Sequence, residues 1–210
     1  CLMPVNGRPL LEYWLCTLHK NGITDVLVNV HYHRYLVEKF LNRERYRDWV
    51  SGTYETELLG TAGTLLEHVE KFSSLTTLLV HADNWCRCDF SDFLEFHAND
   101  RPSHTVMTMM TFRTSSPESC GIVEIDSKGV VNEFHEKIDN PPGDLANGAV
   151  YLIEPEVLSW LRKQPTNSDF STEVLPHFVG HIATWENTDI HCDIGTIQSL
   201  VDAQDHPQPD

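Results

Sequence analysis

The sequence predicts an α/β fold in which a mixed, mostly parallel central sheet carries helices on both faces. Helical and strand-like hydrophobic patterns alternate from the start of the chain, which is typical of βα units around such a sheet. The 210 residues fit one domain, and 40% hydrophobic with 22% charged residues is an ordinary globular composition. No internal repeat points to another architecture.

The first third of the chain predicts a helix, a strand and a second helix. Pro9 fits the first helical position, apolar residues follow at helical spacing, and Gly22 is placed to end the helix. The β-branched run at 25–30 predicts a buried strand, and a second helical pattern covers 36–41.

The next segment predicts another helix and strand. A glycine-containing turn at 59–63 is expected to open the helix, and the continuous apolar run at 76–80 predicts the strand. This strand ends in His81-Ala-Asp-Asn84. The carboxylate of Asp83 is therefore expected at the carboxyl end of a strand.

Beyond Asp89, which is expected to cap a short helix, the chain changes to strands and then returns to helices. Asp126-Ser-Lys-Gly129 has the chemistry of a hairpin turn. The tail at 205–210 is expected to be frayed, which leaves 1–204 as the core domain. The predicted strands cover 105–112, 121–125, 130–134 and 148–153, followed by helices at 154–161 and 171–178, a strand into 191–195 and a helix from Thr196.

The composition excludes some classes of function. A formal charge of −16 argues against a nucleic acid partner, because binding to a phosphate backbone relies on clustered Lys and Arg. No apolar run approaches the roughly 18 residues of a membrane span, so we expect no membrane partner and a cytoplasmic location. An acidic protein that handles phosphates is expected to need a divalent cation. The six cysteines are expected to be free thiols, because no Cys-x-x-Cys pair is present.

Two acidic residues fall where open α/β sheets bind ligands, beyond the carboxyl ends of strands. They are Asp83 and Asp193. Such a pair suits Mg²⁺, because that ion takes one or two carboxylates and completes its octahedron with water and substrate phosphates. The alternative is that each Asp caps a strand-to-helix turn, a frequent role of this residue.

Several sequence blocks resemble a known family. In chain order they are Met3-Pro-Val-Asn-Gly-Arg-Pro-Leu-Leu, Glu57-Leu-Leu-Gly-Thr-Ala-Gly63, His81-Ala-Asp-Asn84, Cys120-Gly-Ile-Val-Glu124, Phe134-His-Glu-Lys137, Ala146-Asn-Gly-Ala-Val-Tyr151 and Asp193-Ile-Gly-Thr196. Their order and spacing are similar to those of the sugar-1-phosphate nucleotidyltransferases. The resemblance covers nearly the whole chain. It implies a Rossmann-like nucleotide-diphospho-sugar transferase fold and an enzyme that joins a nucleoside triphosphate to a sugar 1-phosphate with release of pyrophosphate.

The resemblance also implies roles for charged residues. Asp83 and Asp193 would hold Mg²⁺, and Lys137 would contact phosphate and balance developing charge. The sugar phosphate oxygen would attack the α-phosphorus in line, so catalysis rests on positioning and charge neutralisation rather than on a covalent nucleophile.

A sugar pocket follows from the same resemblance. Glu136 would accept hydrogen bonds from sugar hydroxyls, while Gly121 and Asn147 would line the pocket. Each has a structural alternative: Glu136 and Lys137 could end a solvated hairpin, and Gly121 could form a β-bulge.

The nucleotide would be recognised by Glu57 and by the turn Gly60, Thr61, Ala62 and Gly63, where small residues permit close approach of a base. A plain turn into a helix is the alternative. Leu-Gly-Thr-Ala-Gly is more similar to the mannose-1-phosphate and heptose-1-phosphate guanylyltransferase branches than to the thymidylyl branch, which favours GTP.

The family's Gly-rich loop and its following Pro-Lys step would lie just before Cys1, and the sequence does not contain them. These 210 residues alone are therefore expected to be inactive. Two other functions stay open: a glycosyltransferase of related fold that uses a nucleotide sugar, and a catalytically silent subunit that binds one. Members of the family often oligomerise, so a homo-oligomer is among the expected assemblies.

Three remaining features have structural interpretations. Two thiols one residue apart rarely suffice for a metal site, so those of Cys86 and Cys88 are expected to be partly buried and free. The pair His31 and His33 lacks a third ligand in the sequence and is expected to be structural. The expected core or interface aromatics are Trp14, Trp160 and Trp185.

Overall fold

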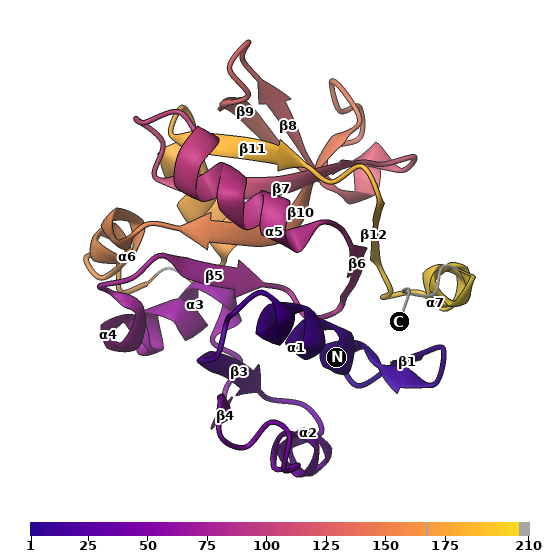
Figure 1. Ribbon diagram of the computed structural model, residues 1–210. Helices are drawn as coiled ribbons and strands as arrows, with labels where there is room; N and C mark the ends of the chain where they lie inside the picture. The colour runs from indigo at the N-terminus through magenta and orange to yellow at the C-terminus, as the bar shows by residue number, and fades with distance from the viewer. Residues whose placement is uncertain (167, 206–210) are drawn as a thin grey trace. The chain divides into compact units, whose positions relative to one another are not determined.

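The computed structural model describes residues 1–166 and 168–205. Of the predicted tail it covers Asp205, and 206–210 lie outside the described residues. The chain divides into two compact units (Figure 1). The first comprises Cys1–Leu59 and the described residues from Ile194 onward, and the second comprises Gly60–Asp193.

The first unit contains a parallel strand pair connected by a helix. β3 (Val26–Val30) pairs in parallel with β4 (Val50–Tyr54), and α2 (Arg34–Leu41) lies between them in the chain. α1 (Leu10–Lys20) precedes β3 and buries most of its side chains. The predicted helices and β3 are confirmed, whereas the sequence did not predict β4. Only one of its five residues is buried, so it lacks the hydrophobic pattern that marks a strand.

The ends of the described chain meet in this unit. β1 (Pro4–Val5) and β2 (Arg8–Pro9) form a short hairpin, and α7 (Ile197–Gln204) is hydrogen bonded to it. The backbone N–H of Asn6 donates to Oε1 of Gln204 at 2.6 Å, and the side-chain amide of Gln204 donates to the carbonyl of Pro4 at 3.1 Å.

The second unit is built on a six-stranded mixed sheet. Its central strand, β10, carries partners on both edges, since β7 lies on one side and β5 and β8 share the other. The strands in spatial order are β11 (Ile182–Glu186), β7 (Met107–Arg113), β10 (Leu145–Ile153), β8 (Gly121–Ile125) and β9 (Val131–Glu136), with β5 (Thr77–Val80) also paired to β10.

Strand direction explains how the sheet is mixed. β10 runs antiparallel to β5 and β7, while β11 runs parallel to β7. β5, β7 and β11 therefore share one direction, and the reversed β10 lies between two of them. The predicted mixed sheet is confirmed, but directly parallel neighbours are fewer than expected: among the described strands they are β3 with β4 and β7 with β11. Hydrophobic patterns report burial and carry no information on strand direction.

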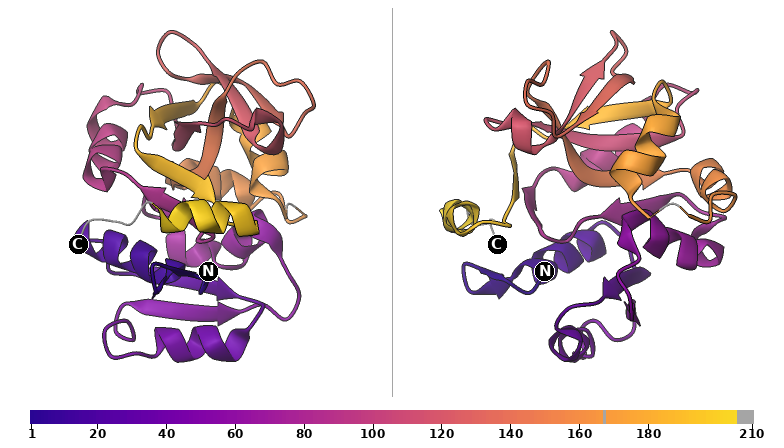
Figure 2. Two further views of the ribbon diagram at one scale, coloured as in Figure 1. Left: turned by 90° about the vertical axis from the view of Figure 1, so that its right-hand side faces the viewer. Right: turned by 180° about the vertical axis from the view of Figure 1, so that it is seen from behind.

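Helices cover both faces of this sheet, as predicted. α5 (Phe90–Glu95) continues into a π-helix, η1 (Phe96–Asp100), on the face where the rings of Phe93 and Trp185 lie 5.3 Å apart. η3 (Phe170–Val174) and η4 (Leu175–Phe178) lie on the opposite face (Figures 1 and 2). No described helix in either unit combines the length and apolarity that crossing a bilayer requires. The other helices here are α3 (Gly60–Glu67), α4 (Val69–Phe72), η2 (Pro117–Ser119) and α6 (Pro155–Leu161).

A separate two-stranded ladder and a β-bulge complete the unit. β6 (Asn84–Arg87), which the sequence did not predict, pairs antiparallel with β12 (Ile190–Asp193). The pairing of β10 with β7 shifts register between Asn147 and Tyr151, where Ala149 has a φ of 52°. The carbonyl of Ala149 accepts a hydrogen bond from the N–H that follows β5, so the bulge is fixed at the carboxyl end of that strand.

Candidate active site

The ladder between β6 and β12 brings the two predicted metal carboxylates together. Asp83 immediately precedes β6, whose first residue, Asn84, pairs directly with Asp193. Opposed residues in such a ladder have Cα atoms about 4.5–5.5 Å apart, so Asp83 and Asp193 come from adjacent positions. Both side chains are exposed.

His81 lies beside this pair. Burial lowers the pKa of the His81 imidazole, and the carboxylates of Asp83, Asp169 and Asp193 oppose that shift. Its Nε2 is buried and has no hydrogen-bond partner among the described residues. The imidazole is therefore a neutral neighbour of three carboxylates at neutral pH.

The donor chemistry at Asp83 and Asp193 fits Mg²⁺. The ion commonly takes one or two carboxylates and fills its remaining positions with water and phosphate oxygens, which exposed carboxylates permit. Among the described residues, neither Asp83 nor Asp193 belongs to a compact cluster of three or more His, Cys, Asp or Glu side chains. The pair thus offers two protein ligands and leaves room for substrate.

The β8–β9 hairpin brings Gly121 and Glu136 together. They are directly opposed, and a Cβ atom at Gly121 would lie 2.8 Å from Oε2 of Glu136 and 2.8 Å from the ring of Phe134. A Cβ atom at this position would force the end of one of these side chains to shift, so this close packing favours glycine. Burial raises the pKa of the Glu136 carboxyl, and the nearby Lys137 ammonium lowers it.

Lys137 leaves the hairpin in a left-handed conformation, with a φ of 49°. Its Nζ lies 3.9 Å from Oε1 of Glu136, and 65% of its side chain is exposed. The ammonium group is therefore held loosely and can reach a bound anion.

The side-chain amide of Asn147 forms hydrogen bonds within the bulge of β10. Its Nδ2 donates to the Tyr151 hydroxyl at 2.6 Å, and its Oδ1 accepts from the backbone N–H of Ala149 at 2.9 Å. Burial raises the pKa of Tyr151, so this hydroxyl stays protonated. Among the described residues, the second N–H of this amide has no acceptor, so Asn147 can offer one N–H to a ligand, whereas a free amide could also accept.

The predicted nucleotide turn is anchored to a distant segment. The backbone N–H groups of Ala62 and Gly63 both donate to the carbonyl of Ser168, at 2.9 and 3.3 Å. The hydroxyl of Thr61 accepts from the N–H of Phe170 at 2.9 Å. The backbone N–H groups of Ala62 and Gly63 already have a protein acceptor, so base recognition by this turn rests on its other groups.

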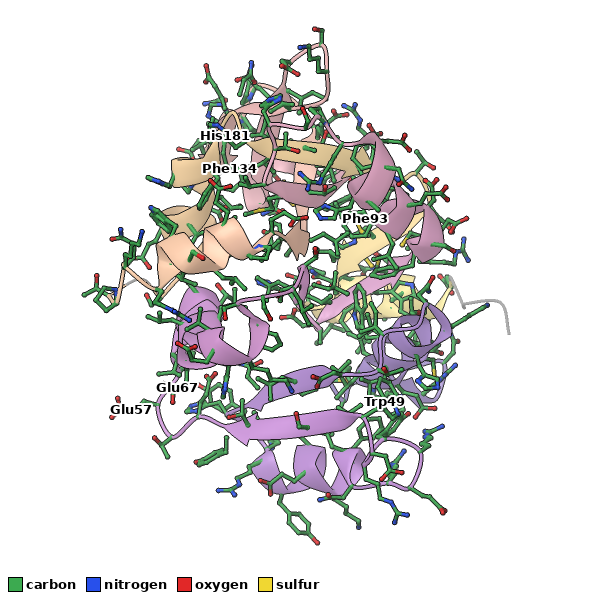
Figure 3. All side chains as sticks on the ribbon, turned by 60° about the vertical axis from the view of Figure 1, so that its left-hand side comes forward. Trp49, Glu57, Glu67, Phe93, Phe134 and His181 are labelled. Atoms are coloured by element: carbon green, nitrogen blue, oxygen red, sulfur yellow. The ribbon has the colours of Figure 1, made fainter. Side chains whose placement is uncertain are left out.

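Gly60 makes this anchoring sterically possible. Its φ is 78°, and a Cβ atom there would collide with the carbonyl oxygen of Ser168. Glu57, the other predicted nucleotide residue, belongs to the first unit and lies exposed in the connection between β4 and α3 (Figure 3). Its role stays a prediction.

Asp169 is a further carboxylate, not singled out from the sequence, whose charge acts on residues of the candidate site. It caps η3, accepting with Oδ1 from the N–H and the hydroxyl of Thr172, each at 2.8 Å. Its charge also raises the pKa of Glu136, Tyr151 and His81. The sequence signal, Asp followed three residues later by Thr, predicts a helix cap and nothing more.

The thiols and the histidine pair have structural environments. Sγ of Cys86 lies 4.0 Å from Sγ of Cys88, and its hydrogen bond with Cys88 together with burial raises the pKa of the Cys86 thiol. Both cysteines are free, as predicted. Nδ1 of His31 is 2.9 Å from the carbonyl of Glu55, a local contact beside β3.

The three tryptophans also pack against protein groups. Trp14 is buried in α1. Trp160 stacks on His177 with ring centroids 4.3 Å apart. The indole N–H of Trp185 donates to Asp92 at 2.8 Å, which agrees with a packing role for this aromatic group.

Comparison with solved structures agrees with this fold. A Bacillus anthracis protein in complex with sucrose, provisionally identified as a glucose-1-phosphate thymidylyltransferase, has a TM-score of 0.85 at 19% identity, over 97% of this chain and 84% of that one. HddC from Yersinia pseudotuberculosis complexed with GMP-PN has a TM-score of 0.79 at 19% identity, over 97% and 88%. Both likenesses support the Rossmann-like α/β fold predicted from the sequence.

Sequence relatives agree with the structures. Mannose-1-phosphate guanyltransferase 2 of Candida glabrata is 26% identical over 179 residues, 82% of this chain and 48% of the relative. Mannose-1-phosphate guanylyltransferase catalytic subunit beta of Drosophila melanogaster is 28% identical over 179 residues, 83% and 47%. The chain spans about half the length of these curated relatives. The family model described as nucleotidyl transferase matches residues 1–208. Because that match covers almost every residue, the chain belongs to the nucleotidyl transferase family.

Proposed function

We propose that the full-length protein joins a nucleoside triphosphate to a sugar 1-phosphate, giving a nucleotide sugar and pyrophosphate. One observation carries the proposal: the ladder of β6 and β12 holds Asp83 and Asp193 at adjacent positions, in the same unit as Glu136 and Lys137. Family membership and the names of the relatives support the same reaction class.

The reaction is an in-line displacement at phosphorus. A phosphate oxygen of the sugar phosphate forms a bond to the α-phosphorus, while the bond to the bridging oxygen breaks and pyrophosphate leaves with that electron pair. Asp83 and Asp193 would hold Mg²⁺, which neutralises phosphate charge when bound. Lys137, whose side chain is exposed, would contact a phosphate oxygen and balance the charge that develops.

The sugar side of the site is built from the hairpin and the bulge. Glu136 accepts hydrogen bonds from sugar hydroxyls, and Gly121 keeps that carboxylate in place because no Cβ intervenes. Asn147 contributes its remaining amide N–H, since Tyr151 and Ala149 hold its other groups. This arrangement suits a polyol better than an apolar ligand.

GTP is the nucleotide we favour. The sequence Leu-Gly-Thr-Ala-Gly supports it, and so do relatives named as guanylyltransferases and a solved structure that holds GMP-PN. Glu57, Gly60 and Thr61 are the groups of the turn region that we propose for nucleotide contact, with Ala62 and Gly63 supplying room for a base.

Pyrophosphate release from the full-length protein tests the proposal. Each nucleoside triphosphate is paired with a panel of sugar 1-phosphates, with Mg²⁺ and with EDTA. We expect release that requires both substrates and Mg²⁺, with GTP preferred. A folded protein that releases none with any pair would refute the proposal. Hydrolysis or transfer from a nucleotide sugar would then indicate a glycosyltransferase, and binding without turnover a silent subunit.

A further inference from the structure

The carbonyl of Gly148, in the bulge of β10, accepts hydrogen bonds from both strands of the β6–β12 ladder. Nδ2 of Asn84, the first residue of β6, donates to it at 3.3 Å. The imidazole of His191, in β12, donates to the same carbonyl. A carbonyl oxygen has two lone pairs, so these two side chains fill its acceptor capacity. The bulge is therefore bonded to both strands that bring the proposed metal carboxylates together.

Gly148 also packs directly against its neighbours. It is buried, and an added Cβ atom would lie 2.9 Å from the carbonyl oxygen of Met110 and 3.3 Å from Cε1 of His191. The first distance is shorter than real Cβ atoms tolerate, so a side chain here would force the backbone to move. The imidazole of His191 thus lies close against the backbone of the bulge.

The hydrogen bond to Gly148 explains why position 191 carries an imidazole. The ring packs on Phe112 with centroids 4.5 Å apart, and its Nδ1 is buried without a hydrogen-bond partner among the described residues. A phenyl ring would pack on Phe112 in the same way and would avoid the free energy cost of an unpaired buried nitrogen. The feature that a phenyl ring lacks is the N–H that the imidazole donates to Gly148.

These contacts join the metal side of the proposed site to its sugar side. Asp83 directly precedes β6, and Asp193 ends β12 two residues beyond His191. Asn147, the proposed sugar-side amide, directly precedes Gly148 in β10. A shift of the bulge relative to the ladder would therefore change the distance between the amide and the two carboxylates.

We propose that His191 is a positioning residue, which holds the amide of Asn147 at a fixed distance from the metal carboxylates through the carbonyl of Gly148. The inference rests on the proposed function, because the phosphate of a sugar 1-phosphate would then lie at the metal while its ring contacts Asn147. His191 acts through the bulge and not by touching the substrate. Its effect falls on the rate, since misplacing a reacting group by about 1 Å can cost roughly 100-fold.

Substitutions at His191 separate positioning from packing. His191→Phe keeps a ring on Phe112 and removes the N–H, whereas His191→Gln retains an N–H donor. We expect His191→Phe in the full-length protein to lower kcat for pyrophosphate release about 10- to 100-fold, with KM for the triphosphate unchanged and Tm not lowered. His191→Gln should recover most of the lost rate.

His177→Phe is a matched control in the same unit. His177 also stacks on an aromatic ring, that of Trp160 at 4.3 Å, and has no contact with the bulge among those described. This variant should keep the wild-type kcat. A normal kcat in His191→Phe, a kcat that falls only together with Tm, or an equal loss in His191→Gln would overturn the inference.

Hydrogen exchange keeps this test apart from the proposed function, because it requires no turnover. Loss of the bond to Gly148 should speed amide exchange in the peptide covering 146–151 about tenfold in His191→Phe, while peptides of the β8–β9 hairpin exchange as in the wild type. Faster exchange in the bulge, with a wild type that releases no pyrophosphate, would refute the reaction and still support the hold of His191 on the bulge. Unchanged exchange would overturn the inference whatever the activity.

Discussion

Replacing Gly60 with alanine tests whether the nucleotide turn is held by Ser168. Two costs are expected at this position. The backbone φ of 78° disfavours any side chain, and the new Cβ would collide with the Ser168 carbonyl oxygen, which also accepts from Ala62 and Gly63. The chain offers a matched control in Gly180, whose φ is 86° and where an added Cβ meets nothing within 4 Å.

The two contacts differ in the loss of stability that each substitution should cause. A left-handed residue other than glycine costs roughly 1–2 kcal/mol, and both variants bear that cost. Overpacking a closed contact costs about 1–3 kcal/mol more, and Gly60→Ala alone bears it. Gly60→Ala is therefore expected to lower the free energy of unfolding by about 2–5 kcal/mol, against about 1–2 kcal/mol for Gly180→Ala.

Urea denaturation, followed by tryptophan fluorescence and circular dichroism, measures the free energies of unfolding of both variants under the same conditions. Gly60→Ala should also weaken GTP binding, because the turn moves with Ser168. If the two variants lose equal stability, the close contact between Gly60 and Ser168 does not contribute to the free energy of unfolding, and Ser168 does not hold the turn.

Three further predictions concern the site and the core. Asp83→Asn and Asp193→Asn should each lower turnover at least about 100-fold in the full-length protein, because a metal ligand is lost, and near-normal pyrophosphate release would remove that carboxylate from the site. Gly121→Ala should raise KM for the sugar phosphate about tenfold or more by displacing Glu136, and a rise in KM for the triphosphate alone would contradict this role. Burial lowers the pKa of His97 more than its bond to a carboxylate raises it, so the unfolded chain binds the proton first and stability should fall as pH drops below about 6.5. Replacing His97 with Gln should flatten that slope in urea denaturation, and an unchanged slope would count against the assignment.

The sequence by itself determined the elements that local forces specify. The helix that begins after Pro9 follows from 3.6-residue periodicity, and the cap at Asp89 is confirmed by its bond to the N–H of Asp92. Hydrophobic runs predicted β5 and β7, because continuous burial requires continuous apolar sequence. The resemblance of short sequence blocks predicted the family, and the proposed roles of Asp83 and Asp193 depend on that resemblance.

Tertiary structure alone decided the features that join distant segments. Nothing near Gly60 in the sequence reveals the carbonyl of Ser168, and the bond from Phe170 to Thr61 joins residues 109 apart. The direction of β10 and the shift of register at its bulge are likewise invisible to periodicity, which records burial and not partners. The sequence around Asp169 predicts a helix cap, and only in the folded chain does its charge act on the pKa values of Glu136, Tyr151 and His81. Local patterns fix which residues are buried, whereas the choice of which buried surfaces meet depends on the free energy of the whole chain.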